Sequence, residues 1–202
     1  MVLQIVVPGT FTASGLPDLG LLGFEDTFNR PDAEALGSTE TPRRLWATNS
    51  KQPTEGGILG GEAYVRTTTT ATQCVATADG RSADGVLECT LGNFAAGQIG
   101  VAFRASSTTD AFRLCSIDGA AYRLSRVASG VTTTLWQSSG VAPTIGDVLK
   151  VTMDGPLIEV YVNGANLFDT EDAHNQTVTR HGFWNNTATT ANRIRDIAFV
   201  AS

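Results

Sequence analysis

The sequence has few charged residues and almost no lysine. Charged side chains make up 17% of its 202 residues, below the typical quarter of a soluble chain. Lysine occurs only as Lys51 and Lys150, the arginines are scattered, and 20 acidic residues stand against 14 basic ones. Because binding to nucleic-acid phosphates requires clustered basic side chains, this composition argues against a nucleic-acid partner.

Long apolar runs are also missing. No stretch approaches the roughly 18 apolar residues that a membrane-spanning helix requires, so we expect no membrane insertion. Residues 1–9 have no basic start, no long apolar core and no small-residue cleavage site, which are the marks of a secretory signal peptide. We therefore expect that the protein is not secreted through such a signal.

Cysteine is scarce. Cys74, Cys89 and Cys115 are the only three, and none forms a Cys-x-x-Cys pair. An odd number cannot form a closed disulfide framework, and the spacing does not suggest zinc binding. We expect three reduced thiols that behave as small buried hydrophobic residues.

Threonine and glycine are abundant instead, with 27 and 21 residues, a composition that favours strands and turns. Alternation of apolar and polar residues, rather than a helical period, runs through most of the chain. The clearest strands are expected over 98–105, 147–153 and 157–162. In the first, Ile99, Val101 and Phe103 should point to one face, with Gly100, Ala102 and Arg104 on the other.

Turn signals separate these strands. The pairs are Asp118-Gly119, Ser129-Gly130, Asp154-Gly155 and Asn163-Gly164, and both residues of such pairs tolerate a positive φ. Strands therefore recur about every ten residues, which is typical of an all-β, antiparallel two-sheet sandwich or jelly roll. A barrel is a less favoured alternative.

The N-terminal segment, residues 1–23, is apolar without a period and rich in proline and glycine. One interpretation is an outer strand laid on the domain. The other is an arm that docks on another subunit, because its apolar side chains would otherwise be exposed. The candidate docking residues are Leu3, Ile5, Val7, Leu16, Leu19, Leu21 and Leu22.

Residues 24–202 carry a resemblance to a known fold family. The segment opens with Phe24-Glu-Asp-Thr-Phe-Asn-Arg-Pro-Asp32. This opening resembles the Asp-x-Phe-x-Arg-x-Asp start of concanavalin A-like jelly-roll domains of the laminin-G type. Later segments resemble that fold's core strands, and 194–199 resembles its last strand, which in the family pairs with the first. The later segments are 100–105, 110–114, 122–124, 147–151 and 159–164.

Domains of this kind with a short N-terminal arm are similar to accessory proteins of tailed phages that infect actinobacteria. The resemblance implies a structural virion protein, most simply a minor tail protein, assembled in the host cytoplasm. Its implied partners are other virion proteins, copies of itself, with a trimer as one arrangement, and host cell-wall glycan. Alternatives are a capsid decoration protein and a free carbohydrate-binding lectin.

Catalytic signatures are not found. Retaining glycan hydrolases of this fold carry a Glu-x-Asp-x-Glu strand, because nucleophile and acid must lie about 5 Å apart. Here Glu88 and Glu159 each stand alone on an apolar strand and are expected to point outward. We predict a protein that is not an enzyme, with a glycan hydrolase as the last alternative.

One acidic cluster is a weak candidate for metal binding. Asp169, Glu171 and Asp172 could offer oxygen ligands to Ca²⁺, which laminin-G-type domains sometimes hold at a loop rim. No other cofactor is expected. His174 and His181 lack the spacing of a metal-binding pair, and each is expected at the surface or at an interface.

Sugar binding needs aromatic rings and amide side chains on a concave face. The candidates are Trp136, Tyr122, Trp184, Asn185 and Asn186. Trp136 alternates with Thr134, which suggests the polar face of its strand. The alternative for each aromatic residue is a place in the sandwich core, where we also expect Trp46.

Overall fold

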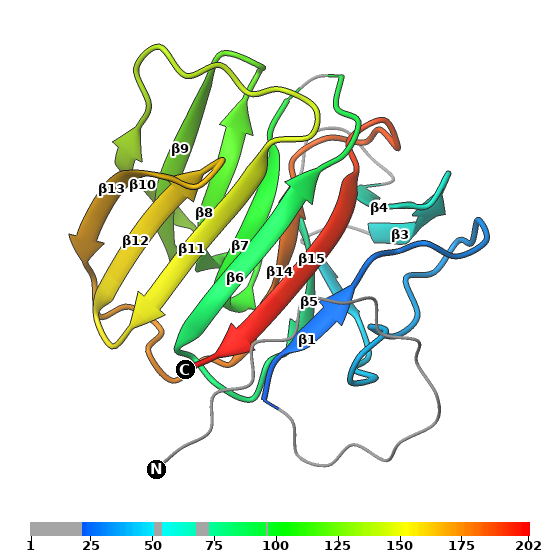
Figure 1. Cartoon of the computed structure of the whole chain (residues 1–202), viewed down its shortest axis with the longest axis horizontal. Coiled ribbons are helices and arrows are strands. Elements are labelled where there is room, and N and C mark those ends of the chain that lie inside the picture. The colour runs from blue at the N-terminus through cyan, green and yellow to red at the C-terminus, as the bar shows by residue number, and fades with distance from the viewer. Residues whose placement is uncertain (1–21, 51–53, 68–72, 96) are drawn as a thin grey trace.

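A computed structural model of the chain describes residues 22–50, 54–67, 73–95 and 97–202 (Figure 1). All regular structure in these ranges is β, and no helix in them is long and apolar enough to cross a membrane. The strands are β1 (Phe24–Asp26), β2 (Ala47–Ser50), β3 (Thr54–Leu59), β4 (Glu62–Thr67), β5 (Cys74–Asp79), β6 (Gly85–Leu91), β7 (Ile99–Ser107), β8 (Asp110–Ile117), β9 (Ala121–Ala128), β10 (Val131–Gln137), β11 (Val148–Asp154), β12 (Leu157–Val162), β13 (Ala165–Glu171), β14 (Arg180–Asn185) and β15 (Ile194–Ala201).

Two antiparallel sheets pack face to face as a jelly-roll sandwich. The eight-stranded sheet has the order β13-β12-β11-β6-β15-β4-β3, with β1 paired to β15, and faces the viewer in Figure 1. The seven-stranded sheet, β10-β9-β8-β7-β14-β5-β2, lies behind it. The outer face of this second sheet therefore points away from the viewer.

One hydrophobic core fills the space between the sheets. It takes alternate residues from both, such as Leu87 and Val151 from the front sheet and Leu114 and Leu124 from the rear one, all fully buried. This alternation is the period-2 pattern of the sequence, because successive side chains of a strand point to opposite faces. The all-β sandwich predicted from that pattern is confirmed.

The predicted strands and turns correspond closely to the structure. β7, β11 and β12 fall on the three strands expected from alternation. Three of the expected turns have positive φ at both residues, with 46° and 68° at Asp118-Gly119 and 52° and 81° at Asn163-Gly164. Asp154-Gly155 differs, because only its glycine has a positive φ.

The outward position predicted for Arg104 is wrong. Its φ is +44° and the β7–β8 register shifts after Phe103, a β-bulge that turns the side chain inward. The Arg104 guanidinium is fully buried and donates to Asp84 at 2.6 Å and to the carbonyl of Gly155 at 2.7 Å. Arg104 thus connects β7 to the β5–β6 loop and to the β11–β12 turn.

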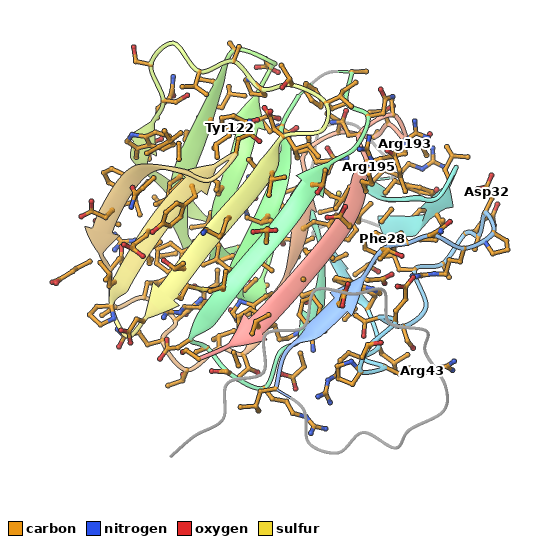
Figure 2. The ribbon with its side chains drawn as sticks, in the orientation of Figure 1. Phe28, Asp32, Arg43, Tyr122, Arg193 and Arg195 are labelled. Atoms are coloured by element: carbon orange, nitrogen blue, oxygen red, sulfur yellow. The ribbon has the colours of Figure 1, made fainter. Side chains whose placement is uncertain are left out.

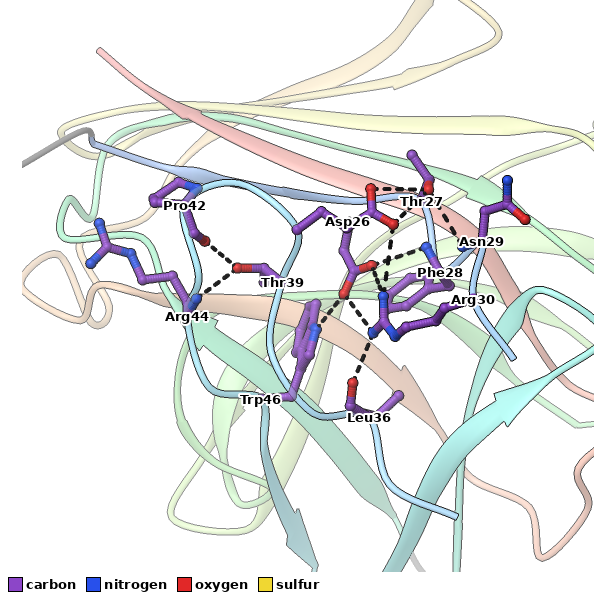
Figure 3. Close-up of polar contacts among 11 residues, drawn as sticks. Asp26, Thr27, Phe28, Asn29, Arg30, Leu36, Thr39, Pro42, Arg44 and Trp46 are labelled. Atoms are coloured by element: carbon purple, nitrogen blue, oxygen red, sulfur yellow. Dashed lines mark hydrogen bonds and ion pairs between the residues drawn. The ribbon is translucent and has the colours of Figure 1, made fainter. Parts of the chain in front are cut away.

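The Asp-x-Phe-x-Arg motif forms a buried network of hydrogen bonds and an ion pair at the start of the domain (Figure 3). The Asp26 carboxylate is fully buried and accepts from Arg30 at 2.6 and 3.0 Å, from the Phe28 backbone at 2.9 Å and from the Trp46 indole at 2.8 Å. A buried charge needs this kind of pairing. The motif is therefore structural, as expected for Trp46.

The first and last strands pair as the resemblance implied. β1 runs antiparallel to β15 with Phe24 opposite Phe199. Of the predicted docking residues, Leu3, Ile5, Val7, Leu16, Leu19 and Leu21 lie outside the described residues. Leu22, just before β1, is 56% exposed. The docking arm stays a prediction.

Candidate functional site

A cavity of about 340 Å³ opens on the outer face of the seven-stranded sheet. Its lining comes from β8, β9, β10 and β14 and from the residues that flank β5, β7 and β14. The lining residues are Gln73, Gln98, Arg113, Cys115, Arg123, Ser125, Thr132, Trp184 and Asn186. The volume lies within the usual range for small-ligand sites, roughly 300–1,000 Å³.

The cavity exists because the central strand carries almost no side chains on this face. One row of side chains runs across four neighbouring strands: Trp184 of β14, Gly100 of β7, Cys115 of β8 and Arg123 of β9. At Gly100 a Cβ would lie 2.1 Å from the backbone oxygen of Leu114, so no larger residue fits there without backbone movement. A floor of small residues between large ones leaves a hollow.

Arg113 and Trp184 form one wall of this hollow. The Arg113 guanidinium carbon lies 4.7 Å from the centre of the Trp184 ring, a cation–π contact. Arg113 also donates to Gln73 at 2.9 Å and to the backbone oxygen of Thr108. Burial lowers the pKa of Arg113 to about 10, so the side chain remains charged at neutral pH.

Arg123 and Gln98 form the opposite wall. The Arg123 guanidinium donates to Gln98 Oε1 at 2.9 Å, and the backbone of Gln98 donates to Asn186 Oδ1 at 2.7 Å. Asn186 returns a backbone hydrogen bond to Gln98 at 3.2 Å. These paired bonds fix both amide side chains at the rim.

Four buried polar atoms at this site have no hydrogen-bond partner among the described residues. They are Arg113 Nε, Arg123 Nε, Trp184 Nε1 and Ser125 Oγ. Such atoms are rare in folded proteins, and each unmet group costs about 1–3 kcal/mol. Atoms of this kind also occur elsewhere, such as Arg126 Nε, but four of them gather around this cavity, which makes it the candidate ligand site.

The structure brings only two of the five predicted sugar-binding residues to this cavity. Trp184 and Asn186 line it. Trp184 is only 3% exposed and carries Arg113 over its ring, so it offers its indole N–H rather than an open face. Stacking of a sugar on this ring, as the sequence suggested, is therefore excluded in this conformation.

Tyr122 and Asn185 are buried on the opposite side of their strands, so their prediction as sugar ligands is wrong. Tyr122, labelled in Figure 2, is fully buried and donates its hydroxyl to Asp147 at 2.5 Å. Asn185 is also fully buried and donates to the Val65 carbonyl at 2.8 Å. Both side chains satisfy interior hydrogen bonds.

Trp136 lies on the core side of β10, away from this cavity. The β9–β10 register shifts between Thr134 and Trp136, and this bulge reverses the face that simple alternation predicts. The Trp136 ring stacks on Phe168 at 5.7 Å between ring centres and packs against the core. The polar-face position expected for Trp136 is wrong.

The predicted calcium ligands are not gathered around one point. Asp169 and Glu171 are exposed on β13, whereas the Asp172 carboxylate accepts from Arg126 at 2.9 Å. No group of three or more histidine, cysteine or acidic side chains in the described ranges could hold a metal ion. The structure therefore gives this cluster no support as a metal site.

The acidic residues considered for hydrolysis lie on the other sheet. Glu88 is exposed on β6, and Glu159 of β12 accepts from Thr152 at 2.5 Å. Glu159 has Asp169 as its cross-strand neighbour, and it borders a second cavity of about 290 Å³ at the end of β11 and β12. Neither Glu88 nor Glu159 lines the cavity of the rear sheet.

Sequence reasoning missed most of the cavity residues, above all Arg113, Arg123 and Ser125. The arginines look scattered along the sequence. A usable signal was present, because Arg113 alternates with the core residues of β8 and Arg123 and Ser125 alternate with those of β9. Two neighbouring strands that each place arginine on the outer face predict a basic face.

Comparisons with known proteins show the fold. No protein-family profile and no curated protein matches the sequence. Among solved structures, the VIP36 exoplasmic/lumenal domain in its Ca²⁺/Man2-bound form aligns with a TM-score of 0.57 at 9% identity, over 89% of this chain and 87% of that one. LamAcat from Zobellia galactanivorans gives 0.55 at 9% identity, over 89% and 97%. The chain thus has the lectin-like jelly-roll architecture, and at this identity the likeness concerns the fold alone.

Proposed function

We propose that the protein is a non-enzymatic carbohydrate-binding module that holds glycan in the cavity of the seven-stranded sheet. The observation that carries this proposal is the set of unmet N–H and O–H groups at a cavity rimmed by Gln73, Gln98 and Asn186. Sugar hydroxyls supply acceptors to such N–H groups, and amide side chains offer both donors and acceptors in return.

The fold gives secondary support. VIP36, whose domain is known in a Ca²⁺/Man2-bound form, shares the jelly-roll architecture. Because one fold serves many functions, the likeness raises the expectation of glycan binding without placing a site. The cavity residues of this chain carry that step.

The absence of acids from the cavity lining supports the non-enzymatic part of the proposal. None of the nine described residues that line it is Asp or Glu, whereas glycoside hydrolysis uses a pair of carboxyl groups flanking the scissile bond. The protein should release no reducing sugar from any glycan that it binds. Activity that is lost in Glu159→Gln would contradict this expectation.

The test is a glycan-array screen followed by titration calorimetry. Gln98→Ala removes a rim amide and Trp184→Phe removes the unpaired indole N–H, and each should weaken binding about tenfold, equivalent to about 1.4 kcal/mol. Trp136→Phe is the matched control, because that ring lies on the core side of β10, and it should bind as the wild type does. Binding that ignores both cavity variants, or no glycan binding at all, contradicts the proposal.

The virion role is a separate proposal that is compatible with glycan binding. As a minor tail protein or a decoration protein, the chain would present this cavity to host cell-wall glycan. The role depends on the arm over 1–23, most of which lies outside the described residues. Its test is therefore assembly of the whole chain, treated in the Discussion.

A further inference from the structure

The unmet polar atoms of the cavity are nearly all hydrogen-bond donors. Arg113 Nε, Arg123 Nε and Trp184 Nε1 each carry a hydrogen and accept nothing, and only Ser125 Oγ can act in both ways. Arg113 and Trp184 are each 3% exposed. A ligand that satisfies these atoms must therefore bring acceptor oxygens.

Within the part of the chain that the structure describes, the same cavity holds two positive charges without a counter-charge. Neither Arg113 nor Arg123 forms an ion pair among the described residues. Arg113 donates to Gln73 Oε1 and to the backbone oxygen of Thr108, and Arg123 donates to Gln98 Oε1, so all of these acceptors are neutral. Five other arginines of the described ranges each lie against a carboxylate, namely Arg30, Arg66, Arg104, Arg126 and Arg193.

The two guanidinium groups also act on each other. Repulsion from Arg123 adds to burial in lowering the pKa of Arg113. Like charges held close together on one face are costly unless an anion lies between them. The arrangement is explained if the ligand of this cavity is negatively charged.

We propose that the glycan bound in this cavity is acidic, carrying a carboxylate, sulfate or phosphate group that contacts Arg113 and Arg123. This inference rests on the proposed glycan site and specifies its substrate class. The anionic oxygens accept from the two Nε–H groups, and the uncharged part of the sugar contacts the amide rim of Gln73, Gln98 and Asn186.

The size of the cavity favours an acidic sugar over a free inorganic anion. Its volume of about 340 Å³ lies within the range usual for sites that hold small organic ligands, roughly 300–1,000 Å³. A small inorganic ion would leave most of the rim without contact. A charged sugar ring fills the space and uses both the basic wall and the amide rim.

The test is an array of paired glycans that differ only in charge. The pairs are oligogalacturonate with its full methyl ester, sulfated with unsulfated galactan fragments, and phosphorylated with unphosphorylated glycerol–sugar oligomers. The charged member of at least one pair should bind at least about tenfold more tightly than its neutral partner, and added salt should weaken it. Inorganic sulfate and phosphate should compete poorly.

The outcomes separate this inference from the proposed function. Equal binding of charged and neutral partners overturns the acidic preference and leaves the glycan site intact. Failure of every glycan to bind overturns the proposed function and this inference together. Full competition by inorganic sulfate or phosphate assigns the cavity to a free anion and overturns the sugar as its ligand.

Variants at Arg123 connect the preference to the cavity. Arg123 is only partly buried, so Arg123→Gln should fold, and it should lose at least about tenfold in affinity for the charged glycan and little for the neutral one. Arg123→Lys, which retains the charge, should recover part of the preference. Arg43→Gln is the matched control, because Arg43 is exposed in the loop between β1 and β2 (Figure 2) and does not line the cavity. An unchanged preference in a folded Arg123→Gln overturns the inference.

Discussion

At the scale of single residues, His181 shows how far the interior departs from a surface environment. The sequence predicted a surface or interface position, but the imidazole is fully buried and stacks on Phe199 at 4.1 Å between ring centres. Nδ1 accepts from the Arg104 backbone at 3.4 Å, so the hydrogen is on Nε2, which donates to the Ser82 carbonyl at 2.9 Å. This neutral tautomer is the one that the packing stabilises.

Acid should therefore destabilise the protein in a defined window. Burial lowers the pKa of His181 to about 4, against about 6.5 in an unfolded chain. Between these values the unfolded state binds more protons, so the free energy of unfolding falls as the pH drops from about 6.5 to about 4, by roughly 3 kcal/mol in total. Denaturant unfolding at pH 7 and at pH 5 measures the part of this loss that falls between those two pH values.

His181→Gln is the control for this prediction. The variant should be less stable at pH 7 but should lose less stability than the wild type between pH 7 and pH 5. A wild-type free energy of unfolding that is the same at both pH values, or a variant that responds to acid as strongly as the wild type, would show that His181 is not the buried titrating group.

The three cysteines should be unreactive in the folded protein. All are buried and free, and burial raises the pKa of Cys74 and of Cys115 to about 12 and raises that of Cys89 as well. Since the thiolate is the reactive form, iodoacetamide at pH 8 should leave the native protein unlabelled. Mass spectrometry should find three adducts after denaturation, and rapid native labelling of any cysteine would contradict the structure.

At the scale of elements, the turns could be predicted from the sequence and the bulges could not. An Asn-Gly pair tolerates positive φ through its own chemistry, so Asn163-Gly164 identified a hairpin without knowledge of its neighbours. The bulges near Arg104 and Trp136 arise from pairing with other strands. One extra residue reverses the face of every side chain after it, which is why alternation misplaced both residues.

The Asn163-Gly164 turn should contribute more to the free energy of unfolding than the Ser129-Gly130 turn does. Its side chain donates to Asp147 at 2.9 Å and accepts from the Val148 backbone at 2.9 Å. Asn163→Ala should lower the free energy of unfolding by about 2–3 kcal/mol, through a strained φ and the two lost bonds. Thermal and denaturant unfolding give the value.

Ser129→Ala is the matched turn variant. Ser129 has a similar φ of 49° before a glycine, and its side chain forms no hydrogen bond with the described residues. Asparagine adopts a positive φ more readily than serine or alanine does, so the larger loss expected for Asn163→Ala contains this preference as well as the two side-chain bonds of Asn163. Equal losses in the two variants would show that those bonds contribute nothing.

At the scale of the whole molecule, the fold followed from local signals and the site did not. Strand length, turn chemistry and alternation are each properties of short segments, and together they gave the two-sheet sandwich. The cavity is made where the outer faces of β14, β7, β8 and β9 meet. Trp184 and Arg113 are 71 positions apart in the sequence, so only the strand order could show that they touch.

The arm is tested by comparing the whole chain with one that begins at Phe24. β1 is paired with β15 from Phe24 onward, so the shorter chain should fold and melt at a temperature close to that of the whole chain. If residues 1–23 dock on other subunits, light scattering should show assembly of the whole chain and a monomer for the shorter one. A monomeric whole chain and an unfolded shorter chain would instead place the arm within the sandwich.

The most direct test of the glycan site uses the indole N–H signals of the three tryptophans. Nitrogen-15 spectra are recorded while the best array glycan is added, and Trp→Phe variants assign each signal. The Trp184 signal should shift, because its N–H borders the cavity and lacks a partner among the described residues, while those of Trp46 and Trp136 should stay in place. A shift of the Trp136 signal with Trp184 unmoved, or no shift with any glycan, would contradict this prediction.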